Sequence, residues 1–237
     1  MEPINRYLDA AILKPELTRD EAVAAIEESI KWKTKTVCVR PCDIELAKSM
    51  CAGTETGVSC VLAFPHGCTT TAVKALEAKE YCRLGVDEID MVANYGMIRS
   101  GRWDYVEADI RAVADVCKTG GAGGAKVPLK VIFETCHLTA EEIAKTTELC
   151  VAAGADFVKT STGFSTGGAT EEAVKVMLDA AKGRIKVKPS GGIRTREQAL
   201  RYVEMGAHRL GTNYTASEAL VTGSTGKTAA EASKAAY

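Results

Sequence analysis

Short apolar runs rich in β-branched residues alternate with longer segments of helical periodicity along nearly the whole chain. The short runs predict eight strands, at residues 7–9, 36–39, 59–63, 88–92, 129–134, 156–159, 184–188 and 209–211. Between them apolar residues recur at helical spacing, as in Val106, Ile110, Val113 and Cys117. Three segments begin with a threonine followed three residues later by Glu or Gln, at 18–21, 139–142 and 195–198, which is typical of a capped helix start.

The order of these elements predicts the fold class. Eight strands with helices between them, and no break in composition, favour a single closed (β/α)8 TIM barrel over residues 1–221. An open Rossmann-like sheet is the alternative, because little more than residues 7–9 supports the first strand. The glycine-rich segment 120–124 precedes a strand, so we expect it to be a loop at the bottom of the barrel. Residues 222–237 are rich in Ala, Ser, Thr, Gly and Lys and predict a flexible C-terminal tail.

Composition and charge narrow the class of protein. Of the 237 residues 46% are hydrophobic, which is enough for a large core and excludes a disordered chain. The 30 basic and 31 acidic residues give a net charge of -1, without the basic excess of a dedicated nucleic-acid binder. No apolar run approaches the roughly 20 residues of a membrane span, and residues 1–17 lack the layout of a signal peptide. Nine cysteines without a C-x-x-C pair indicate reduced thiols, so we expect a cytoplasmic protein that binds neither nucleic acid nor membrane.

Reactive groups in a barrel lie at the carboxyl ends of its strands. The polar residues at the predicted strand ends are Asp9, Cys38, Asp90, Glu134, Lys159 and Lys188. Lys159 shares a strand face with Phe157, inside an enclosed mouth where burial favours the neutral and nucleophilic amine. The alternative is a lysine that emerges just past the strand end and pairs with a carboxylate.

Lys188 ends the next strand and gives the first lysine a neighbour of like charge. Two ammonium groups about 5 Å apart repel by roughly 3 kcal/mol at an effective dielectric constant of about 20. This repulsion lowers the pKa of one lysine, so that Lys188 keeps Lys159 unprotonated, as Schiff-base chemistry requires. Alternation places Lys186 on the same strand face, and it remains the other candidate for the pocket.

Two acids and a cysteine complete the set of candidate groups. Asp90 shares a strand face with Glu88 between apolar residues, and a buried acid needs a partner such as the lysines. It is either half of a structural ion pair or a proton relay, and Asp9 supports the same interpretation more weakly. Cys38 is either a substrate contact or inert packing. The three histidines show no metal-ligand spacing, so no metal or other cofactor is expected.

Two glycine-bearing loops follow the last two predicted strands. Residues 190–195 have the sequence SGGIRT and lead into a capped helix, and residues 211–213 have the sequence GTN. Barrel enzymes often hold a phosphate between these two loops, where small residues let backbone N–H groups approach and a helix N-terminus adds positive potential. A pair of such loops in these places predicts phosphate binding, although a lone Gly-Gly is usually only a tight turn.

Several segments match one known family in order along about residues 5–220. Residues 155–164, with the sequence ADFVKTSTGF, strongly resemble the Schiff-base strand of the deoxyribose-phosphate aldolases. The sequence VKPSGGIRT at 187–195 resembles their second-lysine and phosphate-loop segment. Further similarities are FPHG at 64–67, DEIDMV at 87–92, and Asp9 together with LKP at 13–15.

The resemblance implies a class I aldolase that needs no metal or organic cofactor. Its reaction is the reversible cleavage of 2-deoxy-D-ribose 5-phosphate to D-glyceraldehyde 3-phosphate and acetaldehyde in deoxyribose catabolism, and we expect a homo-oligomer, either a dimer or a tetramer. By the same resemblance Lys159 forms the imine, Lys188 tunes it and Asp90 relays protons. The substrate and its phosphate are expected to contact Cys38, Thr162, Gly163, Gly191, Gly192, Arg194, Gly211, Thr212 and Asn213.

The chain departs from the family pattern at three places. Ala10 and Ala11 follow Asp9 where family members commonly carry a hydroxyl residue, so a substrate hydrogen bond is lost there. Asn213 and Tyr214 replace serines that contact the phosphate in the family. Tyr237 resembles a terminal tyrosine that some members bring into the site to move a proton. The alternatives are another phosphate-binding barrel enzyme, such as an epimerase or a transaldolase-like enzyme, and a non-enzymatic sugar-phosphate binder.

Overall fold

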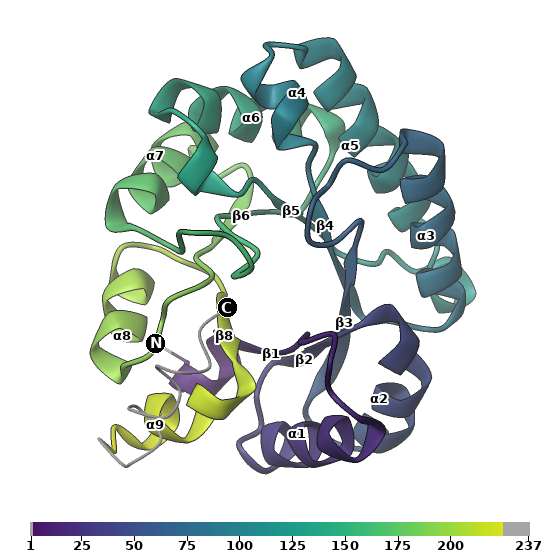
Figure 1. Cartoon of the computed structure of the whole chain (residues 1–237), viewed down its shortest axis with the longest axis vertical. Helices are drawn as coiled ribbons and strands as arrows, with labels where there is room; N and C mark the ends of the chain where they lie inside the picture. Colours follow the sequence, from purple (N-terminus) through teal and green to yellow (C-terminus); the bar gives the residue numbers. More distant parts are fainter. Residues whose placement is uncertain (1, 225–237) are drawn as a thin grey trace.

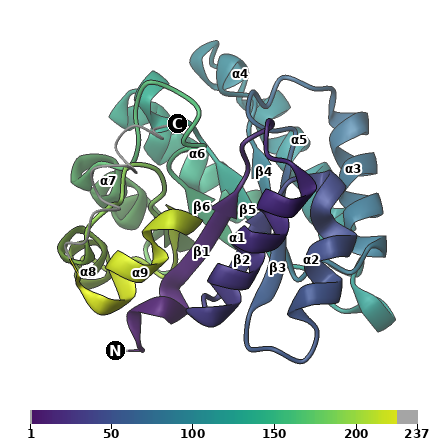
Figure 2. The ribbon, with the colours of Figure 1, turned by 60° about the horizontal axis from the view of Figure 1, so that its bottom comes forward.

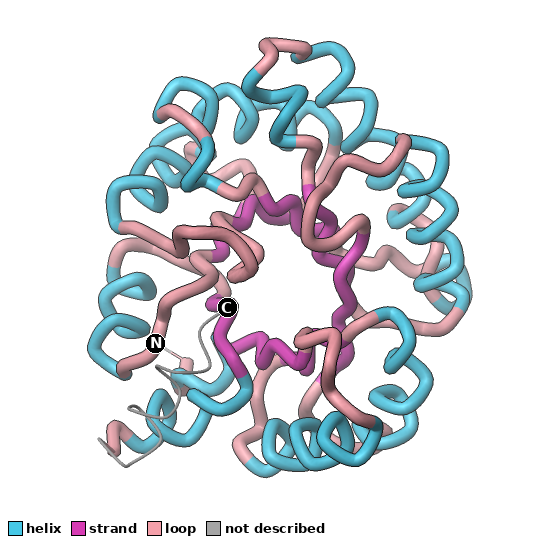
Figure 3. Tube along the Cα trace, viewed as in Figure 1, coloured by secondary structure: helices cyan, strands magenta, loops and turns pink. Residues whose placement is uncertain are grey.

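The computed structural model describes residues 2–224, which form eight parallel strands inside a ring of helices (Figure 1). The strands are β1 (Leu8–Ile12), β2 (Thr36–Val39), β3 (Gly57–Leu62), β4 (Glu88–Val92), β5 (Leu129–Ile132), β6 (Phe157–Lys159), β7 (Lys186–Lys188) and β8 (Leu210–Asn213). Their order in the sheet is β7-β6-β5-β4-β3-β2-β1-β8. The ring closes between β7 and β8 through a bridge from Ser190 to Gly211, and the N–H of Gly211 donates to the carbonyl of Pro189 at 2.8 Å. The ring of strands in Figure 3 confirms the barrel prediction and excludes the open sheet.

Helices follow the strands and cover the outside of the barrel (Figure 2). They are α1 (Arg19–Lys31), α2 (Ile44–Cys51), α3 (Thr71–Arg83), α4 (Tyr95–Arg99), α5 (Trp103–Cys117), α6 (Ala140–Ala153), α7 (Glu171–Ala181), α8 (Arg196–Glu204) and α9 (Ser217–Thr222). The three predicted capping boxes are confirmed at the starts of α1, α6 and α8, where Thr18, Thr139 and Thr195 each accept from the backbone three residues on. The last two helices contact one another, because the Arg196 guanidinium of α8 donates to the carbonyl of Leu220 in α9 at 3.1 Å.

The apolar core lies between the strands and the helices. Alternate strand residues point outward into this core, among them Leu8, Ile12, Val37, Val39, Ile89, Met91, Val131, Val158, Val187 and Leu210. The residues between them point into the barrel and are largely polar: Asp9, Thr36, Ser59, Glu88, Asp90, Lys130, Lys159 and Lys188 are all buried. The outer layer therefore supplies the hydrophobic stabilisation, and the interior is left for charged groups.

Several strand boundaries differ from those expected. β1 begins at Leu8 and continues to Ile12, so Asp9 lies near the start of the strand and not at its end. The two alanines after it extend the strand because they pair with Val37 and Cys38 of β2, and this ladder overrides their low strand propensity. β8 likewise runs on to Asn213, beyond the predicted 209–211.

β3 and β5 end earlier than predicted, and β6 and β7 begin later. β3 stops before Ala63 and β5 before Glu134, because these residues adopt left-handed backbone with φ of 51° and 57°. β6 and β7 begin one and two residues after the predicted 156 and 184, respectively. The glycine-rich segment 120–124 is confirmed as the loop between α5 and β5.

The predicted tail begins at residue 222, and only 222–224 of it belong to the described residues. The division of the chain at 221 and 222, and any part that Tyr237 plays, therefore stay predictions. Within residues 2–224 we find no helix with the length and apolar character needed to cross a membrane.

Candidate active site

Lys159 and Lys188 lie side by side at the carboxyl ends of β6 and β7. They are the last residues of these strands, and the strand register pairs them. Both side chains are buried, and both Nζ atoms donate to the same Oδ2 atom of Asp90, at 2.8 and 2.7 Å. Lys186 is excluded from this cluster, since it is exposed and its Nζ lies 5.2 Å from the ring centroid of Phe157.

Two carboxylates from other strands, β4 and β1, hold the lysines inside the barrel. Asp90 lies in the middle of β4, and its second oxygen, Oδ1, accepts from Lys130 at 2.6 Å. Asp9 of β1 accepts from Lys188 on Oδ2 at 2.5 Å. Its Oδ1 accepts from the Thr36 hydroxyl at 2.8 Å and from Arg209 at 2.7 Å. The parallel strands thus bring the predicted Lys159, Lys188, Asp90 and Asp9 into one hydrogen-bonded cluster.

The two lysines have opposite protonation tendencies. Burial lowers the pKa of Lys159, and the positive charge of Lys188 adds to this effect, while Asp90 opposes it. Burial also acts against the charged form of Lys188, but Asp9 and Asp90 outweigh it and raise the pKa of that residue. The pKa values of the two neighbouring amines are therefore shifted in opposite directions, which favours the free amine at Lys159 and the ammonium at Lys188. The expected repulsion between the two lysines contributes to the lowered pKa of Lys159, but burial is the larger cause.

Both carboxylates are ionised despite their burial. Burial alone favours the protonated acids, but the lysines around Asp90 hold its pKa well below the usual range. Arg209 and Lys188 do the same for Asp9. Asp90 can therefore accept a proton only during a reaction that changes the charge around it.

The loop after β6 is held by hydrogen bonds to Glu134. This buried residue turns back in left-handed backbone, and its carboxylate accepts from the N–H of Thr162 at 3.3 Å and from the Thr162 hydroxyl. The same hydroxyl accepts from the N–H of Phe164 at 2.9 Å. Thr162 and Gly163, which are expected to contact the substrate, thus sit on a loop whose shape is set from the end of β5.

The glycines of the last two loops have different surroundings. Gly191 and Gly192 both have positive φ, of 83° and 77°, and a side chain at Gly192 would enter open space. A Cβ atom at Gly211 would instead lie 2.2 Å from the Ser190 Oγ and 3.3 Å from the Cε of Lys188. Gly211 therefore makes room for the Ser190 side chain and the stem of Lys188, and Gly192 leaves its backbone exposed.

The other predicted phosphate contacts are distributed over both faces of β8 and the next loop. Alternation places the Thr212 side chain on the outer face with Leu210, so only its backbone is directed to the mouth. The Asn213 Oδ1 accepts from the N–H and hydroxyl of Thr215, at 3.1 and 2.9 Å. Arg194 is exposed at the start of α8, where its backbone N–H donates to Gln198 at 2.9 Å.

An apolar wall lies on the side of the mouth formed by β1, β2 and β3. It consists of Leu13, Cys38 and Val61, with Ala11, Phe64 and Phe164 packed against them. The rings of Phe64 and Phe164 meet edge to face, with 5.0 Å between their centroids, and so join the loop after β3 to the loop after β6. Burial raises the pKa of Cys38, which is a neutral thiol in this wall.

The comparison with known proteins assigns this barrel to a family. The sequence model of the DeoC/LacD family aldolases matches residues 8–224. This chain belongs to that family. The deoxyribose-phosphate aldolases of Finegoldia magna and Thermococcus gammatolerans are 47% and 46% identical to it, over 89% of this chain and 95% and 92% of those proteins.

Solved structures support the same assignment for this aldolase. The aldolase QR15 superposes with a TM-score of 0.83 at 40% identity, covering 92% of this chain and 94% of that one. A deoxyribose phosphate aldolase from Aeropyrum pernix, described as a tetramer, gives a TM-score of 0.82 at 25% identity, over 93% and 92% of the two chains. These matches favour an aldolase over the other barrel enzymes and over a sugar-phosphate binder.

Lys130, Glu88 and Arg209 contact this cluster but were not predicted as site residues, although Glu88 was placed on the strand face of Asp90. Lys130 of β5 donates to Asp90 and lies 2.6 Å from Glu88, and Arg209 donates to both oxygens of Glu88 at 2.9 Å. A lysine between Leu129 and Val131 in a predicted strand was the available signal, because alternation places it opposite to its apolar neighbours.

Ala10 and Ala11, which depart from the family pattern, both belong to strand β1 of this barrel. Ala11 belongs to the apolar wall, and Ala10 is buried on the other face of β1. The hydroxyl that Asp9 binds comes from Thr36 of β2, which also lies 3.0 Å from the Ser59 hydroxyl. The expected loss of a hydroxyl after Asp9 thus leaves that side of the mouth apolar.

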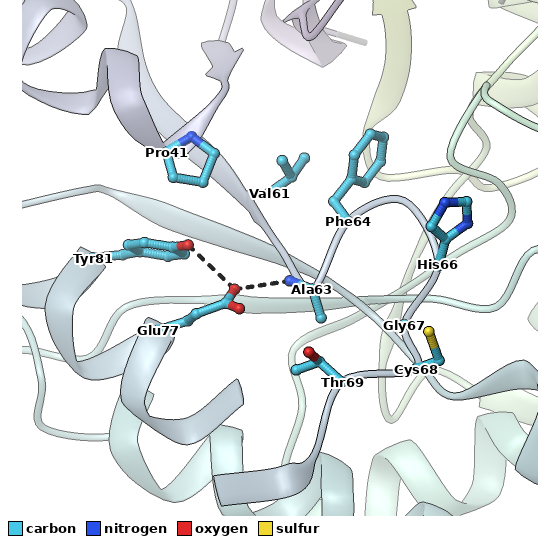
Figure 4. Close-up of a pocket in the computed structure, with 10 residues that line it drawn as sticks. All are labelled: Pro41, Val61, Ala63, Phe64, His66, Gly67, Cys68, Thr69, Glu77 and Tyr81. Atoms are coloured by element: carbon cyan, nitrogen blue, oxygen red, sulfur yellow. Dashed lines mark hydrogen bonds between the residues drawn. The ribbon is translucent and has the colours of Figure 1, made fainter. Parts of the chain in front are cut away.

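A separate pocket of about 340 Å³ lies behind this wall, between the loop after β3 and helix α3 (Figure 4). The Glu77 carboxylate accepts there from the N–H of Ala63 at 2.9 Å and from the Tyr81 hydroxyl at 3.2 Å. These bonds hold the left-handed residue at which β3 ends. Lys159, Lys188 and Asp90 are not among the residues that line the pocket.

The histidines take no part in the lysine cluster. His137 stacks on Tyr95, and its Nε2 lies 2.9 Å from the Ser165 hydroxyl beyond the end of β5. Within residues 2–224, no three His, Cys, Asp or Glu side chains are grouped so that they hold a metal ion.

Proposed function

We propose that this aldolase reversibly cleaves 2-deoxy-D-ribose 5-phosphate to D-glyceraldehyde 3-phosphate and acetaldehyde through an imine on Lys159. The observation that carries the proposal is the buried amine of Lys159, held by Asp90 beside the ammonium of Lys188. Relatives at 46–47% identity that bear the name deoxyribose-phosphate aldolase support the choice of substrate. The reaction belongs to deoxyribose catabolism.

The proposed reaction begins when the Lys159 amine attacks the aldehyde carbon C1 of the open-chain sugar. Water leaves, and the resulting protonated imine is an electron sink for the C2–C3 bond. As that bond breaks, its electron pair moves to C2 and the imine nitrogen, and the C3 hydroxyl gives up its proton. Asp90 receives this proton through a water molecule, since it already contacts Lys159.

The second half of the proposed reaction releases acetaldehyde. C2 of the enamine takes, through water, the proton that Asp90 received and becomes a methyl group, and water then hydrolyses the imine and frees the Lys159 amine. The apolar wall around Cys38 and Val61 borders the mouth where the methyl group forms. Lys188 stays an ammonium group throughout the reaction because Asp9 and Asp90 both bind it. Its positive charge in turn stabilises the two carboxylates. The lysine itself supplies the electron sink, so no metal or organic cofactor is needed for these steps.

The substrate phosphate is proposed to bind at the loops after β7 and β8. Open space beside Gly192 and the start of α8 support this placement, with Gly163, Gly191, Arg194 and the backbone of residues 211–213 as the other contacts. We also propose a homo-oligomer acting in the cytoplasm, supported by the tetrameric description of the relative from Aeropyrum pernix.

Sodium borohydride with acetaldehyde should trap the imine as a reduced two-carbon adduct on Lys159. We expect the adduct there because Lys159 is the amine of the cluster whose pKa is lowered, which favours its nucleophilic free form. Mass spectrometry of the digested protein locates the modified peptide. An adduct on Lys188 would reverse the roles of the two lysines, and no adduct on either would contradict the proposed function.

Replacing Gly192 by valine should raise KM for deoxyribose 5-phosphate far more than KM for unphosphorylated deoxyribose. The side chain would occupy the space left for the phosphate, and steady-state kinetics on both sugars measure the difference. Gly183→Val is the matched control, since Gly183 also has positive φ, of 72°, and open surroundings but lies before β7 at the other end of the barrel. Equal losses on both sugars would mean that Gly192 serves the fold alone.

A further inference from the structure

Seven buried ionisable groups form a continuous column inside the barrel. From the bottom to the mouth they are Arg209, Glu88, Asp9, Lys130, Asp90, Lys188 and Lys159, and we call this set the charge column. Each of its carboxylates contacts at least two of its cations within 4 Å. At its lower end Glu88 borders a cavity of about 520 Å³, lined by Arg6, Lys35, Lys48 and Asp87 among others.

The charges of this column balance at only one protonation state of Lys159. Burial opposes ionisation of all three acids, but the neighbouring cations outweigh it and keep the pKa values of Glu88, Asp9 and Asp90 below their usual range. Arg209, Lys130 and Lys188 stay charged, because the carboxylates raise their pKa values against the effect of burial. Three negative charges therefore face three positive ones, and a proton on Lys159 would leave one net positive charge in the interior.

The groups on the remaining strands do not alter this balance. The Cys38 thiol of β2 faces the lysines, but burial raises its pKa and keeps it neutral. Thr36 and Ser59, on β2 and β3, contribute hydroxyl groups only. Lys186 at the start of β7 is exposed to solvent. Besides burial, the charges that act on Lys159 are thus those of the six other members of the charge column.

Lys130 has the central place among these six. Its Nζ lies 2.6 Å from Oδ1 of Asp90, while Lys159 and Lys188 contact Oδ2 of the same carboxylate. It also lies 2.6 Å from Glu88 and 3.8 Å from Asp9, so it contacts every acid of the column. Without its charge the three acids would face two permanent cations, and Lys159 would become the third by taking up a proton.

We propose that Lys130 is a positioning residue whose ammonium neutralises the acids beneath the mouth and so leaves Lys159 as the free amine that attacks the substrate. This inference rests on the imine chemistry proposed for Lys159. It assigns to Lys130, inside β5, a part in lowering the pKa of Lys159, which the sequence analysis attributed to burial and to Lys188.

The test is a double-mutant cycle on Lys130 and Glu88, read from the pH dependence of kcat/KM. Lys130→Met should move the acidic limb to higher pH by about one to two units, because Lys159 then keeps its proton longer. Glu88→Gln should move the limb to lower pH, since one negative charge is lost. The double variant restores the charge balance, and its limb should return towards that of the unchanged protein.

Lys74→Met is the matched control for the loss of a buried lysine. Lys74 is fully buried and lies 2.6 Å from Asp109, but it belongs to helix α3 outside the barrel. Its removal should leave the acidic limb in place, whatever its effect on stability. The pH dependence of borohydride trapping with acetaldehyde gives a second readout that follows the amine itself.

The outcomes separate this proposal from the proposed function. An acidic limb that stays fixed in both Lys130→Met and Glu88→Gln, with Lys159 still trapped by borohydride, overturns the role of Lys130 alone. If the rate of Lys130→Met falls equally at every pH and the acidic limb stays fixed, Lys130 has a merely structural role. If Lys130→Met does not fold, the acidic limb of Glu88→Gln becomes the test. A shift to lower pH supports the proposal, and a fixed limb contradicts it. Absence of any adduct in the unchanged protein removes the imine chemistry, and the proposal with it.

Discussion

Replacing Lys159 by methionine should lower kcat/KM for deoxyribose 5-phosphate by at least about 10⁴-fold, the scale of loss seen when an enzyme's covalent nucleophile is removed. A thioether cannot form the imine, and no other amine of the site is neutral, because Lys130 and Lys188 are both held as ammonium groups by carboxylates. Coupled detection of glyceraldehyde 3-phosphate measures the rate.

The same substitution should leave the protein as stable as before, or more stable. Lys159 contributes no charge that the column needs for its balance, and methionine has a similar volume without the cost of a buried polar group. Lys186→Met, on the same strand face as Lys188 but exposed, is the control that should keep full activity. Cleavage by Lys159→Met at a readily measured rate would assign the chemistry to another amine.

Replacing Asp90 by asparagine should lower the free energy of unfolding by about 3–5 kcal/mol, the usual cost of breaking a buried ion pair. The amide has nearly the same shape as the carboxylate but no charge, and Asp90 contacts three lysines. The proton relay is lost as well, so kcat should fall by about 10²–10⁴-fold. Urea unfolding followed by tryptophan fluorescence gives the stability, and steady-state kinetics give the rate.

Asp109→Asn separates these two effects. Asp109 is another fully buried acid with a lysine partner, Lys74, and it lies on helix α5 away from the mouth. Its substitution should lower the stability but leave the rate per folded molecule unchanged. An Asp90→Asn protein with an unaltered urea midpoint would show that the lysines do not depend on this carboxylate.

The barrel and the lysine pair follow from local sequence signals. Eight strand-like runs separated by helical segments leave few other topologies, and consecutive parallel strands necessarily place the ends of β6 and β7 together. Lys159 and Lys188 could therefore be paired from the sequence, since both end their strands. The capping boxes were predictable for the same reason, because each depends on residues only three positions apart.

Contacts that depend on register across the barrel could not be predicted in this way. Asp9 reaches Lys188 from 179 positions away, and whether it does so is decided by where β1 begins. Alanines carry little strand propensity, so the pattern placed the end of β1 too early. Lys130 was overlooked because the search covered strand ends, whereas this lysine lies inside its strand.

The phosphate loops show a different limit. The glycines could be recognised, but their separate tasks depend on neighbours from distant segments, as with Gly211 beside Ser190 and Lys188. Thr212 was expected to contact the phosphate, and the pairing of β8 with β1 turns its side chain outward, so that only its backbone faces the mouth. The composition of a loop indicates where a ligand such as phosphate is expected. Which of the loop's atoms face that ligand depends on the register of the neighbouring strands.

The charge column also constrains how this enzyme can change over generations. Its members stabilise one another, while the apolar layer between strands and helices holds the fold from outside. A mutation that alters one interior charge leaves a buried imbalance, but a second mutation of opposite sign nearby removes it. Lineages that acquire a new reaction in such a barrel are therefore expected to exchange interior charges in compensating pairs, and to pass through a less stable ancestor between the two steps.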